Sequence, residues 1–187
     1  MSSLDTSAIK LGALQVSAKG AKQVPIFYTN DKSVFLQLGP LSTLFEPSAF
    51  GDPAATRVNL VLTTNEIVEE TLSELDRRVV ELLAADATRF FGTALTEAQI
   101  LERMQPSLRV SDKGYKSCRM KMNITGRNRV QIYDMNKLPC EAPESWIGTN
   151  VTARLVVKSV WLMNKEWGIL YEAQAVQVNV QVVECPF

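Results

Sequence analysis

The sequence predicts a mainly β fold with inserted helices, arranged as an elaborated antiparallel β-barrel. Three observations favour this class. A long β-hairpin is expected over residues 151–182, several shorter β-type runs precede it at regular spacing, and a helical segment interrupts the order of strands. A parallel doubly wound sheet requires strands and helices that alternate throughout, and this chain does not alternate them. A five-stranded barrel with a helix inserted midway, the OB-fold type, fits better.

The N-terminal part has the pattern of a meander of short strands. We predict strands over Ile9–Ala18, Gln23–Thr29 and Val34–Leu38. The segments between them, 19–22 and 30–33, carry Gly, Asn, Asp and Ser, which are typical turn residues. Strands at this spacing are typical of barrels and sandwiches.

A change of composition separates these strands from the first helix. Residues 39–56 hold three Pro and two Gly, so we expect a loop there, followed by a strand over Arg57–Leu62. Thr63 and Glu66 have the spacing of a helix capping box. The apolar stripe that follows predicts a helix to about Ala87.

A second, shorter helix is expected over 96–104, with Thr96 as its N-cap and Pro106 after its end. The two helices form an insertion at about 64–104. The chain shows no internal repeat, low-complexity tract or linker, so we expect a single OB-fold-like domain over 1–187.

The most basic part of the chain follows the helices. Residues 109–129 contain seven bases and one acid, whereas residues 66–86 contain seven acids and two bases. A strand is expected over Ser117–Thr125, and its alternation places Arg119 and Lys121 on one face. A chain without net charge can in this way present a cationic face to phosphates.

The hairpin supplies two more cations. We predict that it is preceded by a turn at 126–128, a strand over 129–135 and a loop at 136–150. The arms are expected to join at Asn164–Gly168. Alternation in the first arm puts Arg154 and Lys158 on one side and Val157 and Trp161 on the other. We therefore expect Trp161 in the core, and the four cations of the two strands in one groove.

Composition narrows the classes of function. The chain has 187 residues, is 46% hydrophobic, has a formal net charge of zero and contains no histidine. Ser-His-Asp and Cys-His catalysis, the usual zinc sites and His-based acid–base chemistry are thereby excluded. The scattered carboxylates have no spacing typical of a two-metal nuclease. We expect no enzyme activity, no cofactor and no bound metal.

The compartment is inferred from cysteine usage and hydropathy. The three cysteines, Cys118, Cys140 and Cys185, are widely spaced and odd in number, so we expect reduced thiols and an intracellular protein. The N-terminus lacks the apolar region of a secretory signal, and no apolar run is long enough to span a membrane. We expect no membrane partner.

Aromatic residues near the cations complete the predicted interface. A basic groove with aromatic platforms holds single-stranded nucleic acid without sequence preference. We expect Trp167, at the hairpin tip, and Tyr133, among polar neighbours, to be exposed, and we leave Tyr171 undecided. A row of alternating cations is also typical of a solvated strand face that binds nothing.

The order of motifs resembles a known family. The stretches are PLSTLFEPSAFGD, TRVNLVLTT, the helix end RFFG, YKSCRMKM and, most specifically, VVKSVWLMNKEWGILYEAQAVQV, with the pattern Trp161…Asn164…Trp167-Gly168…Gln174. They resemble single-stranded-DNA-binding proteins of nucleocytoplasmic large DNA viruses and of short-tailed phages, over about Pro25 to Val180. The resemblance implies a viral OB-fold protein that coats exposed DNA strands during replication and recombination, without catalysis.

Carried onto this sequence, the resemblance supports both the basic strand and the hairpin. The candidate nucleic-acid-binding residues are Lys116, Arg119, Lys121, Arg127, Arg129, Tyr133, Arg154, Lys158, Trp167 and Tyr171. Expected partners are single-stranded DNA, with RNA left open, a second copy of the chain in a homo-oligomer, and replication proteins. The segment 183–187 lacks the acidic run that often recruits such proteins. The alternative function is a structural protein, such as a small viral β-barrel coat subunit.

Overall fold

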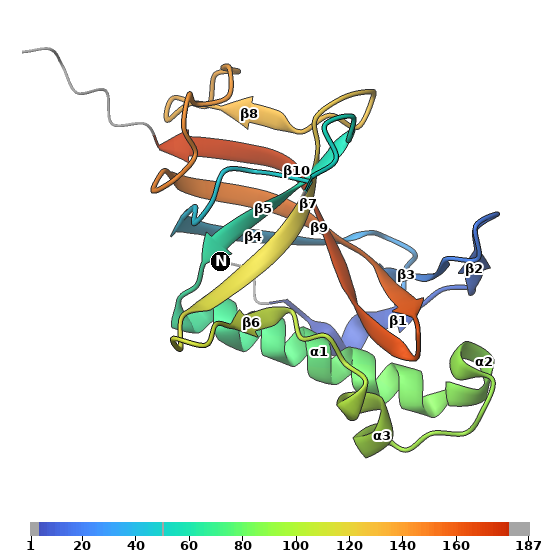
Figure 1. Ribbon diagram of the computed structural model, residues 1–187. Helices are drawn as coiled ribbons and strands as arrows, with labels where there is room; N and C mark the ends of the chain where they lie inside the picture. The colour runs from blue at the N-terminus through green and yellow to red at the C-terminus, as the bar shows by residue number, and fades with distance from the viewer. Residues whose placement is uncertain (1–3, 50, 180–187) are drawn as a thin grey trace, which may run out of the picture.

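The computed structural model describes residues 4–49 and 51–179 (Figure 1). The last residues predicted for the hairpin, 180–182, the chain end at 183–187 and Cys185 lie outside the described residues. The strands are β1 (Ile9–Leu11), β2 (Gln15–Val16), β3 (Lys22–Tyr28), β4 (Val34–Ser42), β5 (Arg57–Thr63), β6 (Leu108–Val110), β7 (Lys116–Asn123), β8 (Gln131–Tyr133), β9 (Asn150–Met163) and β10 (Glu166–Asn179). The helices are η1 (Thr6–Ala8), α1 (Glu66–Ala85), α2 (Ala87–Phe91) and α3 (Glu97–Glu102).

One 10-stranded sheet, curled into an open half-barrel, forms most of the molecule (Figure 1). Its main path runs β1-β3-β9-β10-β7-β5, with β2 on β3, β4 on β9, β6 on β7 and β8 on β10. The pairings are antiparallel except for those of β10 with β7 and with β8. The mainly β, OB-fold-type architecture with inserted helices is therefore confirmed, although its sheet is not wholly antiparallel.

The hairpin of β9 and β10 is the centre of the sheet, and its turn is shorter than predicted. Only Asn164 and Lys165 lie between the paired residues Met163 and Glu166. Both turn residues have positive φ, 52° and 68°, as a two-residue type I′ turn requires. The predicted break at 164–168 is thus wrong beyond Lys165, and Trp167 lies within β10.

A β-bulge changes which side chains of β9 face the core. Leu170 pairs with Ser159 and Tyr171 pairs with Val157, so Lys158 is an extra residue in β9. One inserted residue moves the following side chains to opposite faces. Accordingly Val157 is buried on the core side, and Trp161 falls on the other face, half-buried. The prediction that Trp161 packs in the core is wrong for this reason.

Two local predictions near the helices are corrected. β4 continues to Ser42 where a loop was expected from residue 39. Gly39, at a φ of 123°, approaches β9 so closely that a Cβ would lie 2.5 Å from the carbonyl oxygen of Val151.

Helix α1 is capped by Asn65, whose side chain accepts a hydrogen bond from the Val68 amide, and not by Thr63. The cap predicted at Thr96 is confirmed, with a full capping box.

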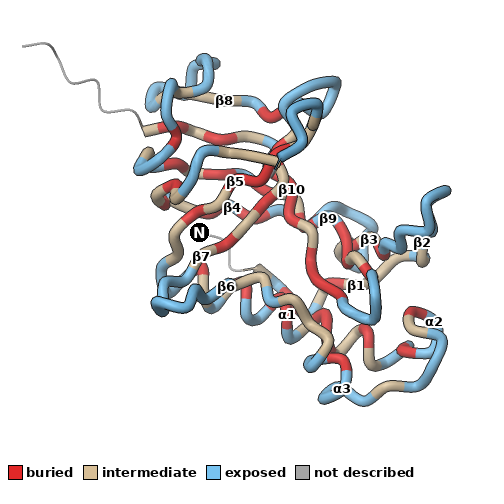
Figure 2. The backbone as a smooth tube through the Cα atoms, in the orientation of Figure 1, coloured by how far each residue is buried: buried red, intermediate tan, exposed pale blue. Residues whose placement is uncertain are grey.

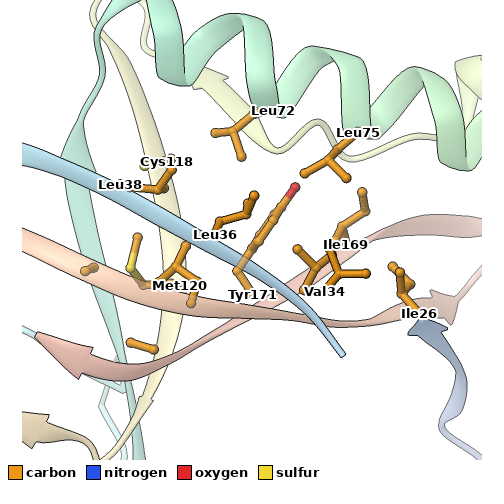
Figure 3. Close-up of a cluster of buried hydrophobic side chains, with 14 of the residues drawn as sticks. Ile26, Val34, Leu36, Leu38, Leu72, Leu75, Cys118, Met120, Ile169 and Tyr171 are labelled. Carbon is orange, nitrogen blue, oxygen red and sulfur yellow. The ribbon is translucent and has the colours of Figure 1, made fainter. Parts of the chain in front are cut away.

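Helix α1 covers the core side of the curled sheet (Figure 1). Leu72 and Leu75 point from the helix into a cluster of buried side chains from the strands (Figure 3). The burial pattern repeats along the strands as alternating buried and more exposed residues (Figure 2). Hydrophobic burial of this kind provides most of the stabilising free energy. No helix among the described residues is long and apolar enough to cross a membrane.

A buried carboxyl group joins α1 to the sheet. Asp76 is 6% exposed and accepts hydrogen bonds from the amide and hydroxyl of Ser107, at 2.9 and 2.6 Å. The Ser107 hydroxyl also lies 2.8 Å from the hydroxyl of Tyr171. Burial raises the pKa of Asp76 to about 6, although the Ser107 hydrogen bonds act in the opposite direction. Burial, followed by the Asp76 charge, raises the pKa of Tyr171.

This raised pKa predicts a pH dependence of stability. The folded protein holds the Asp76 proton more tightly than the unfolded chain does, so the stabilisation is complete below about pH 4 and is lost as the pH rises through about 6. Between about pH 7 and pH 5 we expect wild type to gain roughly 1 kcal/mol relative to Asp76→Asn. Urea denaturation of both proteins at the two pH values measures this difference. A constant difference would show that Asp76 titrates as an ordinary carboxyl group.

Candidate nucleic-acid interface

The strand register places three of the predicted cations, Arg119, Lys121 and Arg154, on one face of the sheet. Lys121 of β7 is paired with Glu172 of β10, and Glu172 is paired with Val156 of β9. Paired residues point to the same face, and residues two apart in a strand do so as well. Arg119 and Arg154 therefore share the face of Lys121, opposite the core. We call this surface the outer face.

A groove of about 510 Å³ hollows the outer face. Its lining comes mainly from β9 and β10, from β3, and from the segment between β7 and β8. Lys158, Arg127 and Arg129 line it, so three of the predicted binding residues meet here from two distant parts of the chain. Arg119, Lys121 and Arg154 are not in this lining, so the prediction that they share one groove with Lys158 is wrong. Phe27, half-buried, lies in the same lining. We call this hollow the basic groove.

A single carboxylate organises the cations at the groove. Glu172 is 6% exposed, and one of its oxygens accepts a hydrogen bond from Lys158 Nζ at 2.6 Å. The same oxygen lies 3.8 Å from a guanidinium nitrogen of Arg57. A buried carboxylate between two cations fixes their positions, because leaving it unpaired would be costly. Arg127 and Arg129 form no ion pair with any residue that the structure describes.

The cations of β7 repel one another. Partial burial, followed by the charge of Arg109, lowers the pKa of Arg119. Partial burial, followed by the charges of Arg119 and Arg57, lowers the pKa of Lys121. Both shifts show that the charged forms are less favourable here than in water. An anion bound at this part of the outer face would relieve that repulsion.

Two predicted aromatic contacts are contradicted by burial. Trp167 is 0% exposed, and its indole nitrogen donates a hydrogen bond to the carbonyl oxygen of Ile100 at 2.8 Å. Its backbone also bonds Arg103 and Gln105, so Trp167 attaches α3 and the following segment to β10. Tyr171 is 5% exposed and points from β10 toward α1 (Figure 3). Neither ring is available to stack on a base.

One predicted cation also lies elsewhere. Lys116 is the first residue of β7, and strand alternation points its side chain to the core side of the sheet, like the buried residues that follow. Its ammonium group pairs with Glu69 of α1 at 2.5 Å. That pair lowers the pKa of Glu69, mainly through the hydrogen bond from Lys116. Lys116 therefore joins the sheet to the helix and is not on the outer face. Tyr133, by contrast, is on the outer face by register with Gln177, and is half-buried.

Besides Phe27 in the groove, the outer face carries two more aromatic residues that sequence reasoning missed. Phe35 of β4 is 40% exposed, and the guanidinium carbon of Arg154 lies 4.9 Å from its ring centroid. Trp161 lies over Gly168 of the paired strand, where an added Cβ would be 2.7 Å from the indole ring. A two-residue turn at 164–165 pairs Trp161 with Gly168. Recognising that turn in the sequence would have placed the Trp161 ring over a residue that has no side chain.

Within residues 4–49 and 51–179, no group of three or more His, Cys, Asp or Glu side chains is arranged to hold a metal ion. Cys118 is a buried free thiol and Cys140 an exposed one. Burial raises the pKa of Cys118 to about 12, so this thiol is not activated as a nucleophile.

Solved structures with a similar fold include single-stranded-DNA-binding proteins of phages. The crystal structure of gp2.5, a single-stranded DNA binding protein encoded by bacteriophage T7, matches with a TM-score of 0.55 and 12% identity, over 79% of this chain and 86% of that chain. The single-stranded DNA-binding protein from bacteriophage Enc34 matches with a TM-score of 0.50 and 12% identity, over 95% and 96% of the two chains. No protein-family model and no curated protein matches the sequence. At these identities the likeness establishes the fold.

Proposed function

We propose that this protein binds single-stranded DNA along its outer face, without sequence preference and without catalysis, and that it covers exposed strands inside the cell during replication or recombination. The proposal rests chiefly on the basic groove, where Arg127, Arg129 and Lys158 meet on the outer face of an OB-type half-barrel. The phage proteins that share this fold are named for the same ligand.

The chemistry of the outer face suits a phosphate chain with unstacked bases. Exposed arginines bind phosphate oxygens and release counterions from the nucleic acid. Phe35 is 40% exposed and Trp161 is half-buried on the outer face, and aromatic rings of this kind can stack on a base of any type, at about 1–3 kcal/mol per base. The groove is also lined by Gln23 and Gln131, whose amides can bond many base edges. Charge, stacking and adaptable amides give affinity with little sequence preference.

The ligand class is tested by titrating the protein with single- and double-stranded oligonucleotides at several salt concentrations. We expect single strands of mixed sequence to bind more tightly than the duplexes, with affinities that decline steeply as salt increases. Similar affinities for homopolymers of different bases would support the absence of sequence preference. Equal affinity for duplex and single strand, or binding unaffected by salt, would contradict the proposal.

A further inference from the structure

We infer that a second pocket, at the tip of the long hairpin, is an additional contact site for the same single strand after it leaves the basic groove. The inference rests on the proposed function and extends it. The pocket measures about 470 Å³ and is formed where four distant segments meet: the β2–β3 turn, α2, the end of α3 and the β9–β10 turn. We call it the hairpin-tip pocket.

The charge of the hairpin-tip pocket is predominantly positive. Lys19, Lys22, Arg103 and Lys165 all line it, and none of them forms an ion pair within the described part of the chain. The lining holds one acid, Glu166, which accepts a hydrogen bond from Gln105 at 3.1 Å. Cations gathered from separate segments and left unpaired are complementary to a polyanion.

The same pocket offers surface for bases. Phe91 is half-buried, and the Arg103 guanidinium carbon lies 5.9 Å from its ring centroid. Met163 is 63% exposed at the end of β9. A cation beside an aromatic ring, with an exposed thioether close by, binds the flat faces of nucleobases. The pocket thus repeats, in a different set of residues, the combination found on the outer face.

The route from the basic groove along β9 favours nucleic acid as the occupant of the pocket. From Lys158 in the groove, β9 leads past Trp161 and Met163 to Lys165 in the pocket. The five steps from Lys158 to Met163, where β9 ends, span about 17 Å at the usual rise of a strand, the length of a few nucleotides. β3 also borders both sites, but Gln23 of the groove and Lys22 of the pocket are consecutive residues that point to opposite faces. The DNA strand therefore reaches the pocket by passing around the hairpin tip, from the outer face to the side of the helices. An acidic peptide would match the charge of the pocket, but its binding would not depend on the cations and rings between the groove and the pocket.

The test is the dependence of affinity on oligonucleotide length. Lys19→Glu with Lys165→Glu removes two pocket cations, both on exposed turns. We expect wild-type affinity for oligothymidines of about four nucleotides, and a deficit of about 10- to 100-fold at 50 mM salt for lengths of about 20. The salt slope for the long strands should fall by about 1.4, since each single-strand phosphate contact contributes about 0.7.

The chain supplies a closely matched control. Lys113 precedes Gly114 (φ 81°) in a turn with the same hydrogen bonds as the turn of Lys19 and Gly20 (φ 81°). Lys137 has a φ of 62°, like the 68° of Lys165. Lys113→Glu with Lys137→Glu should leave binding at wild-type strength for every length.

Two results would overturn the inference. The first is a Lys19→Glu/Lys165→Glu variant whose affinity equals that of wild type for oligothymidines of every length. The DNA strand would then not reach the pocket, and an acidic peptide would become the better occupant. The second is an equal deficit for short and long strands, because the turns would then act on the groove itself. Failure of the proposed function is a separate outcome, in which wild type binds no single strand of any length.

Discussion

Reversing the two free arginines of the basic groove, with Arg127→Glu and Arg129→Glu, is expected to weaken single-stranded DNA binding on the order of 100-fold at 50 mM salt. Each lost phosphate contact reduces the salt slope by about 0.7, and the new carboxylates repel the strand. Both residues are exposed in a turn and form no ion pair within the described residues, so folding should be unaffected. Fluorescence anisotropy at several salt concentrations measures the affinity and the slope.

Two features of this result would distinguish phosphate binding from other causes. Affinity should fall by the same factor on all base compositions, because phosphates carry no sequence information. The Lys113/Lys137 double reversal makes the same change in net charge away from the groove and should bind at nearly wild-type strength. An equal loss of affinity in both double variants would mean that net charge alone determines binding, and that the basic groove is not the binding site.

Replacing Trp167 by alanine is expected to destabilise the fold by about 3–5 kcal/mol, because this side chain is wholly buried. The change also leaves the carbonyl oxygen of Ile100 without its donor and loosens α3 from β10. Chemical denaturation measures the free energy of unfolding. Residual folded protein should still bind single strands, since the ring does not reach the outer face.

Trp161→Ala is the contrasting variant on the same hairpin. Its ring is half-buried on the outer face over Gly168, so the fold should lose less than in Trp167→Ala. Binding should weaken by about 1–3 kcal/mol, or about 5- to 150-fold, through the loss of a stacking platform. The reverse pattern, with Trp167→Ala stable and defective in binding, would restore the role that the sequence alone predicted for Trp167.

The sequence determines much of the fold because its signals are local. Alternating apolar residues identify β9 and β10, and the Thr96 capping box identifies the start of α3. The positions of Arg119 and Lys121 on one face of β7, and of Arg154 opposite the apolar side of β9, follow from strand alternation alone. These predictions require no knowledge of which strands are neighbours.

The errors arise where one residue changes the phase of a strand. The bulge at Lys158 turns Trp161 outward, and a two-residue turn in place of a five-residue break carries Trp167 into the core. Neither the bulge nor the turn length has a clear local signal in this chain. Lys116 was misplaced for a different reason, since its partner Glu69 is 47 residues away in α1. Long-range pairing of this kind depends on the packed fold.

Photo-cross-linking of oligothymidine to the protein, with the attached residues identified by mass spectrometry, tests the central claim most directly. The account predicts cross-links at Phe27, Phe35 and Trp161, which lie on the outer face at or near the basic groove. Cross-links confined to Tyr115 or Phe45, which are 70% and 61% exposed and do not line the basic groove, would contradict it.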